Sequence, residues 1–215
     1  MTWTLGIDTS HVVSAGLALD GEPHTRVLVA DTRAHAESLM PSVLEACARA
    51  GISLRDVDEF AVGMGPGPFT GLRVGVATAW TLAHASGRAA HGVCSLDVVA
   101  RQWAEEGAPA QFVVASDARR KELYWATYRG DGTRVSDPQV SAPESLPALP
   151  VAGAVPSAFS ALVDVQGPES LDPALLAARW QQLLPAGDEP YYLRAADASV
   201  PGAPKSALPR LRAPR

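Results

Sequence analysis

The chain has 215 residues, of which 47% are hydrophobic and 19% charged, so it can bury a core as one large domain or two small ones. Its longest mainly apolar stretch, residues 74–85, is shorter than the roughly 20 residues that span a bilayer, and the N-terminus lacks a signal-peptide pattern. We therefore expect a cytoplasmic protein without a membrane partner. Two cysteines, Cys47 and Cys94, exclude a disulfide scaffold and an all-cysteine metal site.

The formal net charge is −5, and its distribution is uneven. No acidic residue follows Asp197, but four basic residues do: Lys205, Arg210, Arg212 and Arg215. The body is therefore acidic and a poor independent binder of nucleic acid, because such binding comes largely from neutralising phosphates. We expect residues 198–215 to be a disordered basic tail, and its contact with RNA stays open.

The first elements in chain order are three strands. An apolar run over residues 4–9 ends in Asp-Thr-Ser, and residues 12–19 alternate loosely. The turn pair Asp20-Gly21 then precedes a third run over residues 26–30.

A helix is expected over residues 35–50, and Gly51 supplies its end. Its apolar residues share one stripe at helical spacing: Leu39, Met40, Val43, Leu44 and Cys47. The next expected elements are a strand over residues 58–63, a helix over 72–86, a strand over 89–94 and a helix to about residue 106, capped by Ser95 or Asp97. This order predicts an α/β fold with a mixed sheet, antiparallel at first and parallel later.

The pattern then restarts, which suggests a duplicated unit. Strands are expected over residues 111–116 and 122–128, joined across the basic turn 119–121, and one clear helix over residues 172–184. Prolines between residues 138 and 156 exclude long helices there. The expected divisions are an N-terminal lobe (1–107), a smaller C-terminal lobe (108–197) and the tail (198–215).

Two segments could contact phosphate. The glycine- and proline-rich residues 63–71 lie between a strand and a helix, where backbone N–H groups can bind anions. However, the segment matches neither a Walker loop nor a dinucleotide fingerprint, and Pro66 and Pro68 remove two donors, so a rigid turn is the alternative.

Asp8-Thr9-Ser10 and Asp117 each follow a predicted strand, and two such loops facing each other across a cleft are the minimum for phosphoryl transfer. The chain has no Gly-Gly pair, and the second loop carries basic residues in place of glycine. Both aspartates could instead cap turns.

The helix over residues 72–86 is apolar nearly all round. Small residues recur every four positions on one side, at Gly71, Gly75, Ala79 and Ala83. Such a helix must be covered on more than one side, and its own sheet covers only one. Either a partner subunit covers the rest, or a single large domain buries it completely.

The five histidines form no i, i+3 or i, i+4 pair, so no helical metal site can be drawn from them. A hydrolase using Ser10, His35 and Asp8 could be imagined, but the strand-to-helix serine elbow is absent.

Five segments together resemble the bacterial TsaB (YeaZ) family. They are Leu5-Gly6-Ile7-Asp8-Thr9-Ser10, the run from His35 to Pro41, the run from Gly63 to Gly75, the run from Ser116 to Trp125, and Pro190-Tyr191-Tyr192-Leu193-Arg194. The resemblance spans about residues 4–194, and its motifs are specific as a set.

The resemblance implies an actin-like/Hsp70-like ATPase fold of two duplicated lobes with mixed sheets. It also implies a role in making threonylcarbamoyladenosine at position 37 of tRNA. The family's protein is not itself the catalyst: it pairs with the homologous, metal-containing TsaD subunit, a small ATPase, TsaE, joins them, and members also self-associate. It needs no cofactor of its own, because ATP or ADP and the metal belong to the partner subunits, and it meets tRNA indirectly.

We therefore expect a non-catalytic scaffold that binds and activates a TsaD-type transferase. The expected partner-binding residues lie on the first two helices: His35, Leu39, Met40, Val43, Leu44, Leu72, Arg73, Val76, Ala79 and Trp80. A vestigial phosphate loop is expected from Asp8, Thr9, Ser10, Gly65, Gly67 and Asp117. The alternatives are a small-molecule kinase of the same superfold and a peptidase, which only the historical naming of the wider family suggests.

Overall fold

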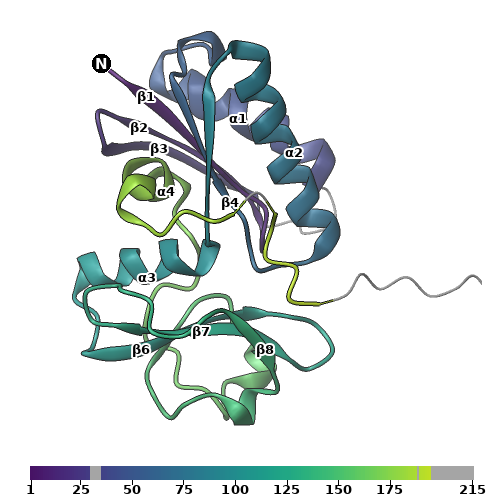
Figure 1. Ribbon diagram of the computed structural model, residues 1–215, viewed down its shortest axis with the longest axis vertical. Helices are drawn as coiled ribbons and strands as arrows, with labels where there is room; N and C mark the ends of the chain where they lie inside the picture. Colours follow the sequence, from purple (N-terminus) through teal and green to yellow (C-terminus); the bar gives the residue numbers. More distant parts are fainter. Residues whose placement is uncertain (30–34, 188, 195–215) are drawn as a thin grey trace, which may run out of the picture.

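A five-stranded mixed sheet organises the first half of the chain in the computed structural model, which describes residues 1–29, 35–187 and 189–194 (Figure 1). Its order is β3-β2-β1-β4-β5, in which β2 runs antiparallel to β1 and β3, and β1, β4 and β5 are parallel. This confirms the predicted mixed sheet. The strands are β1 (Trp3–Asp8), β2 (Val13–Leu19), β3 (Glu22–Val29), β4 (Glu59–Gly63) and β5 (Ala89–Val93).

Helices cover both faces of this sheet. Helices α1 (His35–Ala50) and α2 (Phe69–Ser86) pack on one face, where Leu5 and Ile7 of β1 point into their core. The short helix α4 (Pro173–Arg179) packs on the other. Gly6 of β1 lies directly against the backbone of α4, where a Cβ would overlap the carbonyl oxygen of Pro173. The sheet is therefore buried on both sides.

A second sheet forms the other lobe, in the order β8-β7-β6-β9. Helix α3 (Ser95–Glu106) packs on it, with the Trp103 and Phe112 rings edge to face at 4.8 Å. The antiparallel β6–β7 pair and the parallel β6–β9 pair repeat the arrangement of β1 with β2 and β4, as expected for duplicated lobes. The strands are β6 (Gln111–Asp117), β7 (Leu123–Arg129), β8 (Gln139–Ser141) and β9 (Val151–Ala152).

The two lobes exchange helices. Helix α3 precedes residue 107 but packs on the second sheet, whereas α4 belongs to the second half of the chain but packs on the first sheet (Figure 1). Both helices consequently lie between the sheets. The division of the chain into lobes at residue 107 stays a prediction. The helices α3 and α4 each pack on the sheet that lies on the other side of this division.

The last expected helix is shorter than predicted. Asp172 caps α4 by accepting hydrogen bonds from the backbone N–H groups of Ala174 and Leu175, but the helix ends at Arg179. A 3-10 turn, η4 (Trp180–Gln182), follows, and then an irregular strap over residues 183–187 and 189–194. The strap bonds to the edge strand β5, where Ala186 N–H donates to the Gly92 carbonyl, and then to the Met64 carbonyl through Tyr191 N–H.

The remaining short helices of the described chain are η1 (Leu54–Asp56), η2 (Pro143–Ser145) and η3 (Ser157–Phe159). Among the described helices, none has the length and apolar character that crossing a membrane requires.

Candidate functional site

The loop after β1 holds the Asp8 carboxylate inside the protein. Asp8 Oδ1 accepts hydrogen bonds from the Ser10 backbone N–H at 2.9 Å and from Ser10 Oγ at 2.7 Å. Its Oδ2 accepts one from Ser95 Oγ at 2.5 Å, and Ser95 Oγ in turn accepts from Gly65 N–H. Burial raises the pKa of the Asp8 carboxyl, and the hydrogen bonds from Ser95 and Ser10 oppose that rise. The carboxylate is thus committed to internal contacts.

The glycine- and proline-rich segment covers this loop. Gly67 lies against the Ser10 backbone, where a Cβ would overlap the Ser10 carbonyl oxygen. Thr9 Oγ1 donates to the Gly71 carbonyl at 2.7 Å, and Gly75, one turn along α2, lies against Thr9. The segment therefore acts as a rigid turn that fixes α2 on the loop. Its Gly63 lies so close to Asp8 that a Cβ there would overlap the carboxylate.

The second loop, after β6, also uses its aspartate to close a turn. Asp117 Oδ1 accepts from the Arg119 backbone N–H at 2.8 Å, and Asp117 Oδ2 lies 3.2 Å from the Arg119 guanidinium. Arg119, Arg120 and Lys121 all have positive φ angles, of 60°, 51° and 64°. Both predicted phosphate loops therefore have the geometry of the alternative interpretation, in which the aspartates cap turns.

A cleft of about 790 Å³ separates these two loops. His11 and Val12 line it from the first lobe, and Asp117 and residues 153–157 from the second. Asp8 and Ser10 line only a small adjoining cavity of about 30 Å³. The structure thus places the loops on opposite sides of one cleft, but it keeps Asp8 out of the larger space.

The chemistry of the cleft is unfavourable for a polyphosphate. The described side chains that line it include the carboxylates of Asp117 and Glu169 and no Lys or Arg. Phosphate binding usually relies on cationic side chains or on a row of free backbone N–H donors. Asp117 is paired with Arg119, which does not line the cleft, and the negative charge of Glu169 disfavours an anion there.

The expected partner-binding residues divide by exposure. Helices α1 and α2 lie side by side (Figure 1). Four of the residues have buried side chains that belong to the lobe's own fold: Leu39, Val43, Leu72 and Ala79. A buried side chain cannot touch a partner, so the expectation of direct contact is corrected for these four: they hold the helices in place.

The other members remain accessible. Leu44 is 52% exposed and Trp80 38% exposed, which is unusual for large apolar side chains. Arg73 is exposed, and Met40 and Val76 are half-buried. The side chain of His35 lies outside the described residues. We refer to the four accessible apolar residues Met40, Leu44, Val76 and Trp80 together as the helical face, of which Trp80 lies on the side of α2 that borders β5 and the strap.

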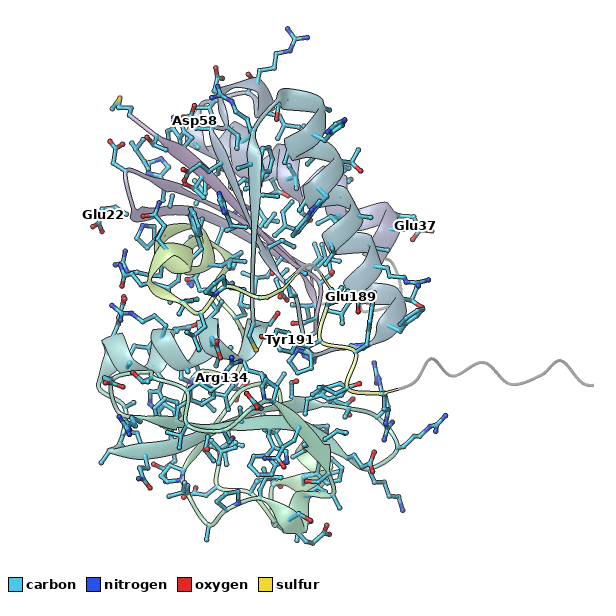
Figure 2. The ribbon with its side chains drawn as sticks, in the orientation of Figure 1. Glu22, Glu37, Asp58, Arg134, Glu189 and Tyr191 are labelled. Atoms are coloured by element: carbon cyan, nitrogen blue, oxygen red, sulfur yellow. The ribbon has the colours of Figure 1, made fainter. Side chains whose placement is uncertain are left out.

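Sequence reasoning missed a buried polar network at the junction of the lobes. Tyr128 Oη donates to Asp97 Oδ1 at 2.8 Å, and the Arg134 guanidinium lies 3.4 Å from the same oxygen. Figure 2 shows Arg134 beside Tyr191 of the strap, whose ring centroid is 6.0 Å away. Burial raises the pKa of Asp97, which Arg134 opposes. The available signal was the charged residue Asp97 in the first turn of α3, directly before the apolar run 98–100.

Comparison with known proteins places the chain among tRNA-modification proteins. Residues 29–174 match the family model of TsaD, tRNA N6-adenosine threonylcarbamoyltransferase. An uncharacterized protein of Mycobacterium tuberculosis is 44% identical over 206 residues, which cover 90% of this chain and 92% of that protein. The tRNA threonylcarbamoyladenosine biosynthesis protein TsaB of Escherichia coli is 36% identical over 129 residues. That match covers 59% of this chain and 55% of the E. coli protein, so the similarity spans about half the length of that relative.

Solved structures agree with this placement. YeaZ from Pseudomonas aeruginosa superposes with a TM-score of 0.68 at 27% identity, covering 85% of this chain and 93% of that one. A P. aeruginosa protein described as similar to the peptidase YeaZ gives a TM-score of 0.73 at 27% identity, over 90% of this chain and all of that one. These likenesses confirm the expected α/β, actin-like fold of two lobes.

Proposed function

Because this chain belongs to the TsaB (YeaZ) family, we propose that it takes part in making N6-threonylcarbamoyladenosine in tRNA as a non-catalytic subunit that binds and activates a TsaD-type transferase. The observation that carries the non-catalytic part is the state of Asp8. Its carboxylate is buried under the segment 63–71 and bonded to Ser10 and Ser95, so it is not free to hold a metal–phosphate group.

The helical face supports the partner-binding part. Trp80 and Leu44 are exposed on two adjacent helices whose buried sides already complete the lobe. Large apolar side chains that stay exposed on a folded lobe are candidates for contact with a partner. A relative of this chain is the natural partner, because a tRNA N6-adenosine threonylcarbamoyltransferase of Rhizobium meliloti is 43% identical over 65 residues.

The remaining parts of the proposal follow from the same role. The ATP or ADP and the metal belong to the partner subunits, a TsaE-type ATPase joins the complex, and a homodimer through the helical face competes with the heterodimer. The complex works in the cytoplasm, and this chain meets tRNA as part of it.

The test is a pull-down of the TsaD homologue from the same cell with two charge-inserting variants, Val76→Asp and Trp80→Asp. Both should abolish heterodimer formation, because an interface cannot accommodate an unpaired charge. Val135→Asp is the matched control, since Val135 is an exposed valine of the second lobe, 58% accessible, and should bind like the parent chain. Circular dichroism checks that each variant is folded, and normal binding by both helical-face variants would refute the placement.

A small-molecule kinase is the second candidate, because two aspartate-bearing loops do face one cleft of about 790 Å³. Calorimetry with ATP and Mg²⁺ separates the two. Micromolar binding by the isolated chain would favour the kinase, and absence of binding would favour the scaffold.

Peptidase activity has less support. The Ser10 hydroxyl donates directly to the Asp8 carboxylate, whereas in a serine triad the hydroxyl donates to a histidine that the carboxylate orients. A casein assay with Ser10→Ala as control settles this point.

A further inference from the structure

Basic and aromatic side chains form a continuous band from the start of α2 to the turn between β6 and β7. We call this band the basic edge, and its residues are Phe69, Arg73, Arg119, Arg120, Lys121, Tyr192 and Arg194. It lies outside the interlobe cleft, none of whose lining residues it contains. Apart from Arg73, which is one of the expected partner-binding residues, the function proposed above gives these residues no role.

Aromatic rings make up the end of the band at α2. The Phe69 and Tyr192 rings are 4.9 Å apart between centroids and inclined by 47°. The Arg73 guanidinium lies 3.9 Å from the Phe69 ring centroid, in a cation–π contact. Tyr192 is 37% exposed, and Arg73 is exposed. This end therefore offers an open ring beside a cation.

The strap joins these rings to the basic turn. Two residues after Tyr192, the Arg194 guanidinium donates to the Ala118 carbonyl at 2.9 Å and forms an ion pair with Glu122. The strap thus ends against the β6–β7 turn, as the end of its ribbon in Figure 1 shows. The two halves of the band are parts of one surface.

The β6–β7 turn carries charged side chains at positions whose backbone conformation favours glycine. Three successive residues, Arg119, Arg120 and Lys121, have φ angles between 51° and 64° and are exposed. Glycine adopts this left-handed conformation without a steric penalty, whereas each side chain adds roughly 1 kcal/mol. Strained non-glycine residues cluster at functional sites. Charged side chains at this turn therefore point to a binding role.

The net charge of the basic edge is positive on an otherwise acidic body. Among the described residues, the basic edge carries five cationic side chains, and the carboxylates of Asp117 and Glu122 pair with two of them, Arg119 and Arg194. In sequence, the residues after Arg194 add one acidic residue, Asp197, and four basic ones, Lys205, Arg210, Arg212 and Arg215. Phosphates attract such a surface, and an exposed ring beside cations is the platform on which unpaired bases stack. An acidic protein partner could pair with the cations, but its binding would not require the exposed Tyr192 ring.

We propose that the basic edge binds the tRNA substrate of the complex, with Arg120 and Lys121 on backbone phosphates and the Tyr192 ring against an unpaired base. This inference rests on the proposed function, and it gives this subunit a direct part in holding the RNA.

The experiment uses the assembled complex of the full chain with its TsaD homologue and a fluorescent tRNA transcript, titrated at several salt concentrations. Arg120→Gln/Lys121→Gln should weaken tRNA binding and lower the slope of log affinity against log salt by about 2, one for each phosphate contact. The matched control, Arg55→Gln/Arg129→Gln, removes two exposed arginines elsewhere and should leave the slope unchanged. Tyr192→Ala should also weaken binding, and Tyr192→Phe should restore it because the ring remains.

Size-exclusion chromatography on each variant separates this inference from the proposed function. The proposed RNA contact would be wrong if the Arg120/Lys121 variant formed an intact heterodimer and bound tRNA as tightly as the parent. It would also be wrong if the Arg55/Arg129 control lost as much tRNA affinity as that variant. Variants that lose a protein partner but keep tRNA would overturn the assignment to RNA. Should the parent chain form no heterodimer, the proposed function fails, and the same salt series on the chain alone still tests the edge.

Discussion

Asp8 is surrounded by three hydrogen-bond donors and has no access to the large cleft, so its role in this protein is to tie elements together. Through Ser95 it joins the end of β1 to the start of α3, and through Gly65 that bond extends to the segment before α2. Asp8, which was predicted to belong to a phosphate loop, instead joins β1, α3 and the segment before α2.

Replacing this carboxyl should separate its packing role from its charge. Asp8→Ala leaves the Ser10 and Ser95 groups without their acceptor, so we expect a loss of about 1–3 kcal/mol in the free energy of unfolding. Asp8→Asn keeps an acceptor for Ser10 and a donor toward Ser95, so it should be tolerated. Urea unfolding at pH 7 measures both, and equal losses for the two variants would contradict this account.

The raised pKa of Asp8 also predicts a pH dependence. Its pKa is raised from 3.8 by burial, so the native state favours the protonated form more than the unfolded chain does. The stability from this group is therefore fully present below pH 3.8 and is lost as pH rises through the higher native pKa. The unfolding free energy of the parent relative to Asp8→Asn should fall over that interval and then level off. Asp97 titrates in both proteins, and a difference that stays constant with pH would count against the raised pKa.

At the scale of elements, α2 is positioned by small residues that meet the loop after β1. Gly75 lies against Thr9, whose Oγ1 would overlap a Cβ at position 75. A glycine inside a helix normally destabilises it by about 1 kcal/mol relative to alanine. Here the direct contact reverses the sign.

We expect Gly75→Ala to destabilise the protein by about 1–3 kcal/mol through overpacking. Adding Thr9→Ala should recover part of that loss, because the hydroxyl that the new methyl would meet is gone. Urea unfolding of the two single variants and the double variant gives the coupling between the positions. A stabilising Gly75→Ala would mean that α2 does not lie this close to the loop.

The regular elements were predictable where periodicity and end signals agree. Helix α1 was predicted with the bounds it has, since its apolar stripe and Gly51 mark it, and the turn residues Asp20-Gly21 predicted the turn that joins β2 to β3. Helix α4 was predicted too long, because the apolar residues after Arg179 pack as an irregular strap and periodicity alone does not show that.

Much of the site depends on tertiary contacts, which sequence patterns do not encode. The pairing of Asp97 with Tyr128 and Arg134 joins distant positions. The burial of Leu39 and Leu72, expected on a partner surface, depends on how the two helices share one face of the sheet. The choice between phosphate loop and turn cap for Asp8 likewise needed the position of Ser95.

For the whole molecule, the exchange of helices predicts a single folding unit. A fragment of residues 1–107 lacks α4, leaving one sheet face bare, and a fragment from residue 108 lacks α3. We expect the full chain to unfold in one cooperative transition and neither fragment to fold alone. Calorimetry and circular dichroism measure this, and a folded first fragment would show that the lobes are independent.

The charge of the whole molecule gives an incomplete account of its surface. An acidic average argues against independent nucleic-acid binding, yet the basic edge has four cations where the strap meets the β6–β7 turn and a fifth, Arg73, on α2. We therefore expect the chain alone to bind RNA weakly and the other subunits of the complex to strengthen that binding.

The most direct measurement is formation of threonylcarbamoyladenosine in a tRNA transcript by the TsaD and TsaE homologues supplied with threonylcarbamoyl adenylate and ATP, with the parent chain, with Asp8→Asn and without this chain. The account predicts that modification requires the chain, proceeds equally with Asp8→Asn, and does not occur with the chain alone. Modification that is indifferent to the chain, or that disappears with Asp8→Asn in a folded complex, would contradict it.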